Sequence, residues 1–162
     1  MKSLCFGPAF AILVTLTVSC GLFDIKPGSR PTQVVNFPSM IDKPAHEITT
    51  IVGKPPYRDD KDLGVDWELP EGNLSLSHTS GSLPTPYRTR FITYDLKPDF
   101  GFATPEEMAE LVHIDVKGEK PEKDRRGILN YRDLTVNGKK VNLSIEPRDR
   151  GRYTNATLSY DE

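Results

Sequence analysis

Apolar residues form one long run near the start of the chain, whereas elsewhere they recur at regular intervals. The run extends from Leu4 to Val18, and Lys2 is the only charged residue before Asp24. A membrane-spanning helix needs about 20 apolar residues, so this run is too short to cross a bilayer and is typical of a secretory leader. We therefore expect residues 1–19 to be a signal peptide.

Two later segments have the periodicity of amphipathic helices. Thr104 and Glu107 flank a proline and form a capping box, in which each side chain accepts a hydrogen bond from the other residue's backbone amide. This pattern predicts a helix from Pro105 to His113. A second, weaker helix is predicted from Pro44 to Val52, where β-branched residues lower the helix propensity and Gly53 ends the segment.

Alternating apolar and polar residues predict antiparallel strands in both halves of the chain. In the second half, Asn137-Gly138 lies between two such runs and supplies the positive φ of a type I′ turn, which predicts a hairpin. The strands expected on this basis cover residues 66–69, 73–77, 87–96, 134–136, 141–145 and 153–160. We expect each half to form a three-stranded meander with one helix packed on one face.

Short sequence blocks recur in the same order in the two halves. Asn73-Leu74-Ser75-Leu76 returns as Asn142-Leu143-Ser144-Ile145, and the block Tyr87 to Asp95 returns as Tyr153 to Asp161. The order predicts a duplication and an α+β fold of two tandem helix-plus-antiparallel-meander units, residues 38–98 and 99–162. It also predicts that Trp67 and Tyr131 occupy equivalent places in two cores. The side chains expected to face inward are Leu74, Leu76, Leu143 and Ile145.

Composition and charge narrow the functional classes. The chain has 162 residues, of which 36% are hydrophobic and 27% are charged. This length suits one ordinary domain or two small ones, and it excludes a large multidomain enzyme. The formal net charge of −2 provides no cationic field for nucleic acid. Because both cysteines, Cys5 and Cys20, lie in the first 20 residues, we expect no disulfide and no cysteine-based metal site in the folded body. We also expect no cofactor.

The end of the apolar run resembles the lipobox of bacterial lipoproteins. Ser19 and Cys20 fit that pattern, whereas Thr17 stands where the family usually has leucine. The resemblance implies that Cys20 is lipidated and that two acyl chains anchor the protein stably in a membrane. Gly21, in place of aspartate, implies an outer-membrane location facing the periplasm. Residues 20–37 are then expected to form a flexible tether; the alternatives are a cleaved secretory leader and an uncleaved anchor.

The predicted body also resembles known families. The helix, Gly53-Lys54-Pro55, Trp67-Glu68 and the strand that follows are similar to the pattern of SmpA/BamE-like lipoproteins of the outer-membrane assembly machinery. The tandem arrangement resembles the β-lactamase-inhibitor-protein fold. These families usually place two helices before the sheet, and here one is evident in each unit. The resemblance implies a non-catalytic module that binds another envelope protein.

Catalytic chemistry has little support in the sequence. The common hydrolase, metalloprotease and nucleotide-binding motifs are absent, and His46, His78 and His113 fall in different predicted elements. We therefore expect no catalytic residues, no metal and no enzyme activity. The alternatives are an envelope hydrolase acting on peptidoglycan or lipid, and a secreted binding domain. A histidine and an acid in one cleft favour the hydrolase, whereas a broad exposed apolar sheet face favours the binder.

One aromatic residue stands on a strand face that otherwise reads as polar. Phe91 occupies the place that Thr157 holds in the second copy, with Tyr87, Arg88 and Arg90 close by in the sequence. Aromatic residues and arginine are typical of protein-binding hot spots. These four residues are the candidate partner-binding site, and the alternative is that Phe91 is buried where two units pack together.

Overall fold

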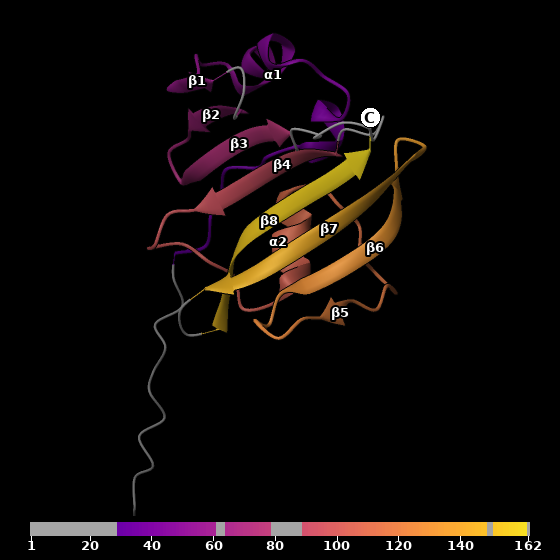
Figure 1. The fold of residues 1–162 in the computed structure, drawn as a ribbon. Coiled ribbons are helices and arrows are strands. Elements are labelled where there is room, and N and C mark those ends of the chain that lie inside the picture. Colours follow the sequence, from indigo (N-terminus) through magenta and orange to yellow (C-terminus); the bar gives the residue numbers. More distant parts are fainter. Residues whose placement is uncertain (1–28, 61–63, 79–88, 149–150, 162) are drawn as a thin grey trace, which may run out of the picture.

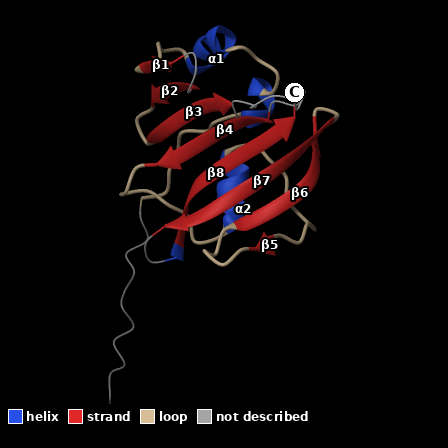
Figure 2. Ribbon diagram, in the orientation of Figure 1, coloured by secondary structure: helices blue, strands red, loops and turns tan. Residues whose placement is uncertain are grey.

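The computed structural model describes residues 29–60, 64–78, 89–148 and 151–161. Within these residues the fold is α+β, with two short α-helices and an eight-stranded antiparallel sheet (Figures 1 and 2). The helical elements are η1 (a 3-10 turn, Phe37–Met40), α1 (Ala45–Val52) and α2 (Pro105–Leu111). The strands are β1 (Arg58–Asp60), β2 (Gly64–Glu68), β3 (Gly72–His78), β4 (Thr89–Leu96), β5 (Glu122–Lys123), β6 (Leu129–Val136), β7 (Lys139–Arg148) and β8 (Arg152–Asp161).

Local sequence signals set the helix ends. The predicted capping box at Thr104 and Glu107 is confirmed, with both of its hydrogen bonds present. Gly53 has a φ of +75° and ends α1, as predicted. Helix α2 ends at Leu111, two residues before the predicted end, because His113 has a φ of +60° and the amide of Ile114 donates to the carbonyl of Ala109. A residue in the left-handed region reverses the chain there.

The sheet consists of two antiparallel meanders joined by their last strands. Its order is β1-β2-β3-β4-β8-β7-β6-β5, so β4 and β8 are neighbours in the centre. They pair from Thr89 opposite Asp161 to Asp95 opposite Asn155. The predicted hairpin between β6 and β7 is confirmed, since Asn137 and Gly138 have φ values of +51° and +78°. The chain therefore forms one continuous sheet.

One hydrophobic core lies between the helices and one face of the sheet. Leu74, Leu76, Leu143 and Ile145 are each at most 3% exposed, which confirms that they face inward. Trp67 and Tyr131 are also buried, but they belong to the same core, which runs across both meanders. The indole Nε1 of Trp67 donates to Thr49 Oγ1 at 3.2 Å, which places α1 on this face. The sequence predicts two cores, and pairing of β4 with β8 merges them into one.

The segment that leads into η1 is packed on the body. Val35 and Phe37 are buried, and their amides donate to the carbonyls of Leu111 and Val112. The Glu71 carboxylate accepts hydrogen bonds from Thr32 and Gln33 at 2.7–2.8 Å. Residues 29–37 are thus part of the folded body, where the sequence predicts a flexible tether, because two apolar side chains and one carboxylate fix the segment.

The hydrogen bonds of this segment also affect ionisation. Partial burial by itself raises the pKa of Glu71, but the hydrogen bonds donated by Gln33 and Thr32 outweigh it and hold the pKa below its ordinary value. No helix in the described residues has the length and hydrophobicity that a membrane-spanning helix requires. The predicted signal peptide, the predicted lipidation site Cys20 and the first part of the predicted tether lie outside the described residues.

Candidate functional site

The face of the sheet opposite the helices, called here the open face, is the candidate site. In β3, β4 and β8 the residues that alternate with core positions are half-buried and point to this side. Figure 1 shows α2 on the other side of the sheet, behind β8 and β7. The Tyr160 hydroxyl accepts from the Asp42 amide on the helical side as well. Within the described chain, the contacts of the helices and of the 29–43 segment are with the helical side.

A row of polar residues crosses the open face perpendicular to the strands. Strand register places one member from each of the eight strands directly opposite the next. In order across the sheet they are Arg58, Asp66, Ser75, Thr93, Thr157, Ser144, Asn130 and Glu122. We call the five uncharged members from Ser75 to Asn130 the central row. The charged residues are confined to the two ends of the full row.

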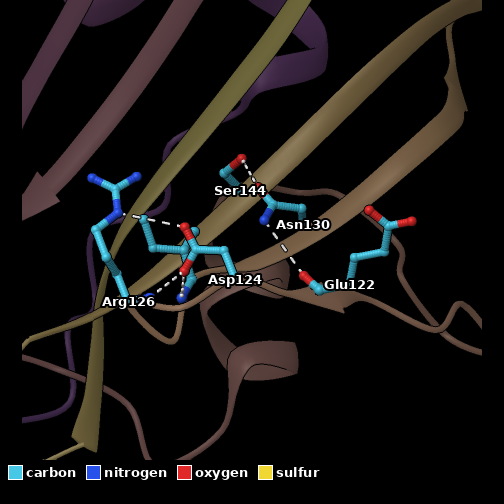
Figure 3. A network of polar contacts seen from close by, with 6 residues as sticks. Glu122, Asp124, Arg126, Asn130 and Ser144 are labelled. Atoms are coloured by element: carbon cyan, nitrogen blue, oxygen red, sulfur yellow. Dashed lines mark hydrogen bonds and ion pairs between the residues drawn. The ribbon is translucent and has the colours of Figure 1, made fainter.

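Members of the central row are hydrogen-bonded to one another and to a neighbour. Thr157 Oγ1 donates to Asn155 Oδ1 at 3.2 Å and lies 3.1 Å from Thr93 Oγ1. Because a hydroxyl carries one hydrogen, Thr157 accepts from Thr93. On the other side, Ser144 Oγ donates to Asn130 Oδ1 at 2.8 Å (Figure 3). These bonds fix the side-chain orientations before any ligand arrives, and they leave lone pairs and amide hydrogens available.

Ion pairs and backbone hydrogen bonds hold the two ends of the row. Asp66 is 6% exposed, and its Oδ2 lies 2.7 Å from Nε of Arg58. At the other end, Asp124 Oδ1 accepts the amides of Arg126 and Ile128 (Figure 3). Desolvation raises the pKa of Asp124, but these hydrogen bonds and the charge of Arg126 prevail and lower it. The loop before β6 is thereby fixed beside Asn130.

Two small hollows flank the central row over β7 and β8. One, of about 150 Å³, is lined by Asp95, Glu146 and Asn155 together with residues at the β7–β8 end. There Nη2 of Arg148 donates hydrogen bonds to both carboxylate oxygens of Asp95, each at 2.9 Å. The other, of about 130 Å³, includes Asn142 and Ser159. Both hollows are polar. The open face is thus hollowed on either side of Thr157 and Ser144.

The structure separates the predicted partner-binding residues. Phe91 lies on the open face, half-buried, directly opposite Ser77 in β3 and Ser159 in β8. Arg90 points to the helical side, where its guanidinium donates to the Lys43 carbonyl at 2.9 Å. Neighbouring strand residues point to opposite faces, so Arg90 and Phe91 do not form one surface. Tyr87 and Arg88 lie outside the described residues.

A second candidate is a groove of about 440 Å³ at the end of α2. It is lined by the polar residues Glu106, Glu110, His113, Asp115 and Lys117 and by the apolar residues Ile114 and Val116. His46 and His78 belong to α1 and β3, so the three histidines come from separate elements. The described residues contain no group of three or more histidine, cysteine or acidic side chains arranged to hold a metal ion.

The large exposed apolar side chains of the described residues are not part of the central row. Among the described residues they are Val34, Ile51 and Tyr57, none of which belongs to a strand of the open face. The open face therefore differs from the apolar sheet face that would favour a protein binder. Sequence alternation places its polar residues correctly. It does not reveal that they align into one row, because that alignment depends on the register between strands that are distant in sequence.

Comparisons with protein-family profiles, curated proteins and solved structures find no match for this chain. The resemblances to the lipobox, to SmpA/BamE-like lipoproteins and to the β-lactamase-inhibitor-protein fold therefore stay predictions.

Proposed function

We propose that the protein is a non-catalytic binding module of the cell envelope, anchored through lipidated Cys20, that holds its target on the open face. The observation that carries this proposal is the central row, a set of hydroxyl and amide groups orientated by mutual hydrogen bonds and not contacted by the described helices. A surface that is ordered in advance loses less entropy when it binds. The sequence predicts another envelope protein as the partner.

A lipid anchor at Cys20 limits how far the folded body lies from the membrane. Nine residue steps separate Cys20 from Ser29, the first described residue. A fully extended chain spans at most about 3.5 Å per residue, so lipidated Cys20 keeps Ser29 within roughly 30 Å of the membrane surface. The resemblance to bacterial lipoproteins, with Gly21 in place of aspartate after Cys20, implies an outer-membrane location facing the periplasm. The target then lies in the envelope, within reach of a body that cannot diffuse away.

We also infer that the two meanders are tandem units related by duplication. The aligned blocks match Ile92 with Leu158, and these residues lie directly opposite each other in the β4–β8 pair, as a local two-fold relation requires. The Asn-Leu-Ser blocks fit less well. Leu74 lies opposite Tyr94, whereas Leu143 lies opposite Leu158, which is a two-residue difference in register. An even shift keeps both leucines on the core face.

The groove beside α2 supports one alternative, the envelope hydrolase, because it brings His113 close to acidic side chains. A catalytic histidine is normally orientated by a partner. Among the described residues, the exposed His113 ring makes no hydrogen bond to Glu106, Glu110 or Asp115 of this groove. The hydrolase proposal predicts that His113→Ala abolishes release of fragments from peptidoglycan or lipid substrates. The binding proposal predicts no such release by the wild-type chain.

The anchor is tested by Cys20→Ala. We expect this variant to lose incorporation of labelled fatty acid and to leave the membrane fraction or to stay unprocessed, because no other cysteine follows the leader. Cys5→Ala is the matched control and should be labelled as the wild type is. Unchanged labelling of Cys20→Ala would contradict the anchor.

The binding surface is tested by crosslinking in intact envelopes, followed by purification of the crosslinked chain. We expect the wild type to form specific adducts that Ser144→Arg loses, since an arginine in the central row obstructs the open face. Glu110→Arg, on the helical side, is the control and should keep the adducts. Equal adducts from both variants would refute the open face as the binding surface.

A further inference from the structure

We propose that the open face binds an N-acetylated glycan strand of the cell wall, laid across β3, β4, β8, β7 and β6 along the central row. This inference rests on the proposed function, since an anchored envelope module meets such a strand within its reach. It names the chemistry of the target, for which the sequence alone predicts another protein.

The spacing of the central row suits a linear polymer. Neighbouring strands lie about 4.8 Å apart, so five aligned residues form a line about 19 Å long. The register aligns all five without interruption. One strand spacing is similar to the length of one hexopyranose unit in an extended glycan. A strand lying on the row therefore meets a new hydroxyl or amide group at each sugar.

The functional groups of the open face match those of an N-acetylated sugar. The central row is neutral, and serine, threonine and asparagine can each donate and accept hydrogen bonds, as sugar hydroxyls do. Side-chain amides stand among these hydroxyls and can pair reciprocally with an acetamido group. The four asparagines of the face are Asn73, Asn130, Asn142 and Asn155. A neutral polyhydroxylated ligand exchanges its water contacts for these groups without burying an unpaired charge.

Phe91 supplies the apolar contact that a sugar ring needs. It lies two residues before Thr93 in β4 and therefore on the same face of the sheet. The residues directly opposite it in the neighbouring strands, Ser77 and Ser159, are small. The π face of an aromatic ring is negatively polarised and attracts the C–H bonds of a sugar face. The hollow beside Asn142 and the hollow beside Asn155 lie on either side of the row and give space for substituents.

The composition of this surface argues against a protein partner on it. The cores of protein interfaces are enriched in aromatic residues, methionine and arginine and depleted in serine. Serine, threonine and asparagine predominate on the central strands of the open face, and Phe91 is the aromatic residue that the described part of these strands places there. Val34, Ile51 and Tyr57, the large exposed apolar residues of the described chain, do not belong to these central strands.

The test is sedimentation of the full chain, purified in detergent, with purified peptidoglycan sacculi. We expect saturable binding that a soluble hexamer of N-acetylglucosamine competes away and that cellohexaose, which lacks acetamido groups, does not. The key variant is the double substitution Thr93→Val and Thr157→Val. It replaces both partners of the Thr93–Thr157 hydrogen bond by groups of the same shape. Asn155 Oδ1 also loses the hydrogen bond from Thr157, but Asn155 is half-buried on the open face, where water can replace that bond. The melting temperature should therefore stay close to that of the wild type.

We expect the double variant to bind sacculi at least about tenfold more weakly, since two hydroxyls that contact the glycan are lost. Thr50→Val, the same chemical change on α1, should bind as the wild type does. Phe91→Leu keeps apolar volume without the ring and should weaken binding several-fold, which tests the surface a second time. Wild-type chain that stays in the supernatant, or variants that bind with unchanged affinity, would overturn the glycan inference. Protein adducts at Ser144 without sacculus binding would also overturn it, while leaving the proposed binding function intact.

Discussion

Leu158→Ala tests whether the two meanders fold as one unit. Leu158 is fully buried in β8, directly opposite Ile92 in β4 and Leu143 in β7, and α2 packs against the same strand. Truncating a buried leucine removes its apolar contacts and leaves a cavity, at a cost of about 2–5 kcal/mol. We expect a value in the upper half of that range, because paired strands on both sides and a helix above restrict collapse of the cavity.

The assay is urea unfolding followed by tryptophan fluorescence and by circular dichroism. Trp67 is the one tryptophan of the chain and is buried in β2, so its fluorescence reports on the meander that does not contain the substitution. If the shared core makes one cooperative unit, both signals shift to the same lower midpoint with an unchanged slope. Ser159→Thr, the neighbouring position on the open face, should change stability by less than about 0.5 kcal/mol. A Trp67 transition that stays at the wild-type midpoint would refute the single core.

Three further predictions concern local contacts. Because the pKa of Glu71 is lowered from its ordinary 4.5, the ionised carboxylate stabilises the fold above that pH, and this contribution is lost as the pH falls through the folded-state pKa. The stability deficit of Glu71→Gln should therefore shrink from pH 7 to pH 3 in urea titrations. A constant deficit would contradict a stabilising role for the hydrogen bonds that Glu71 accepts from Thr32 and Gln33. Gly72→Ala should destabilise the protein by about 1–3 kcal/mol, since a Cβ there would come 2.7 Å from the buried ring of Tyr94. An unchanged free energy of unfolding in calorimetry would contradict this and show that the backbone shifts to accommodate the methyl group. Thr104→Ala should cost about 1 kcal/mol through loss of the N-cap, whereas Thr104→Ser, measured in the same denaturation series, should retain most of the stability.

Local signals predicted the elements that depend on few neighbours. The Asn137-Gly138 turn follows from backbone preferences at two residues, and the capping box follows from two side chains. Strict alternation identified the inward leucines because a strand has a period of two. These features would form in much the same way in many folds.

Features that depend on distant partners were not predictable. Strands β1 and β5 are three and two residues long and polar, and they form because neighbouring strands offer them an edge. Residues 29–37 read as a tether because their anchors, Glu71 and the end of α2, lie far away in the sequence. The merged core depends on β4 meeting β8, a pairing that no local pattern contains.

The candidate site shows the same division. Alternation predicted a solvent-facing set of Tyr153, Asn155, Thr157 and Ser159, and it is correct for the last three. Tyr153 instead packs against the core, next to the register shift between Glu146 and Pro147. It could not align Thr157 with Ser144 and Asn130, because register shifts lie near Tyr131 and Glu146 in the strands involved. A β-bulge changes register without a distinctive sequence pattern. Arg90 and Phe91 do not share a surface, because consecutive strand residues point to opposite faces.

The most direct test of an anchored module that binds through its open face is photo-crosslinking in living cells from single positions. A photoreactive amino acid replaces Ser144 on the open face or Glu110 on the helical side, in the full chain with Cys20 intact. We predict that the Ser144 position captures a specific envelope component and that the Glu110 position does not. Capture from Glu110 alone, or equal capture from both positions, would contradict the account.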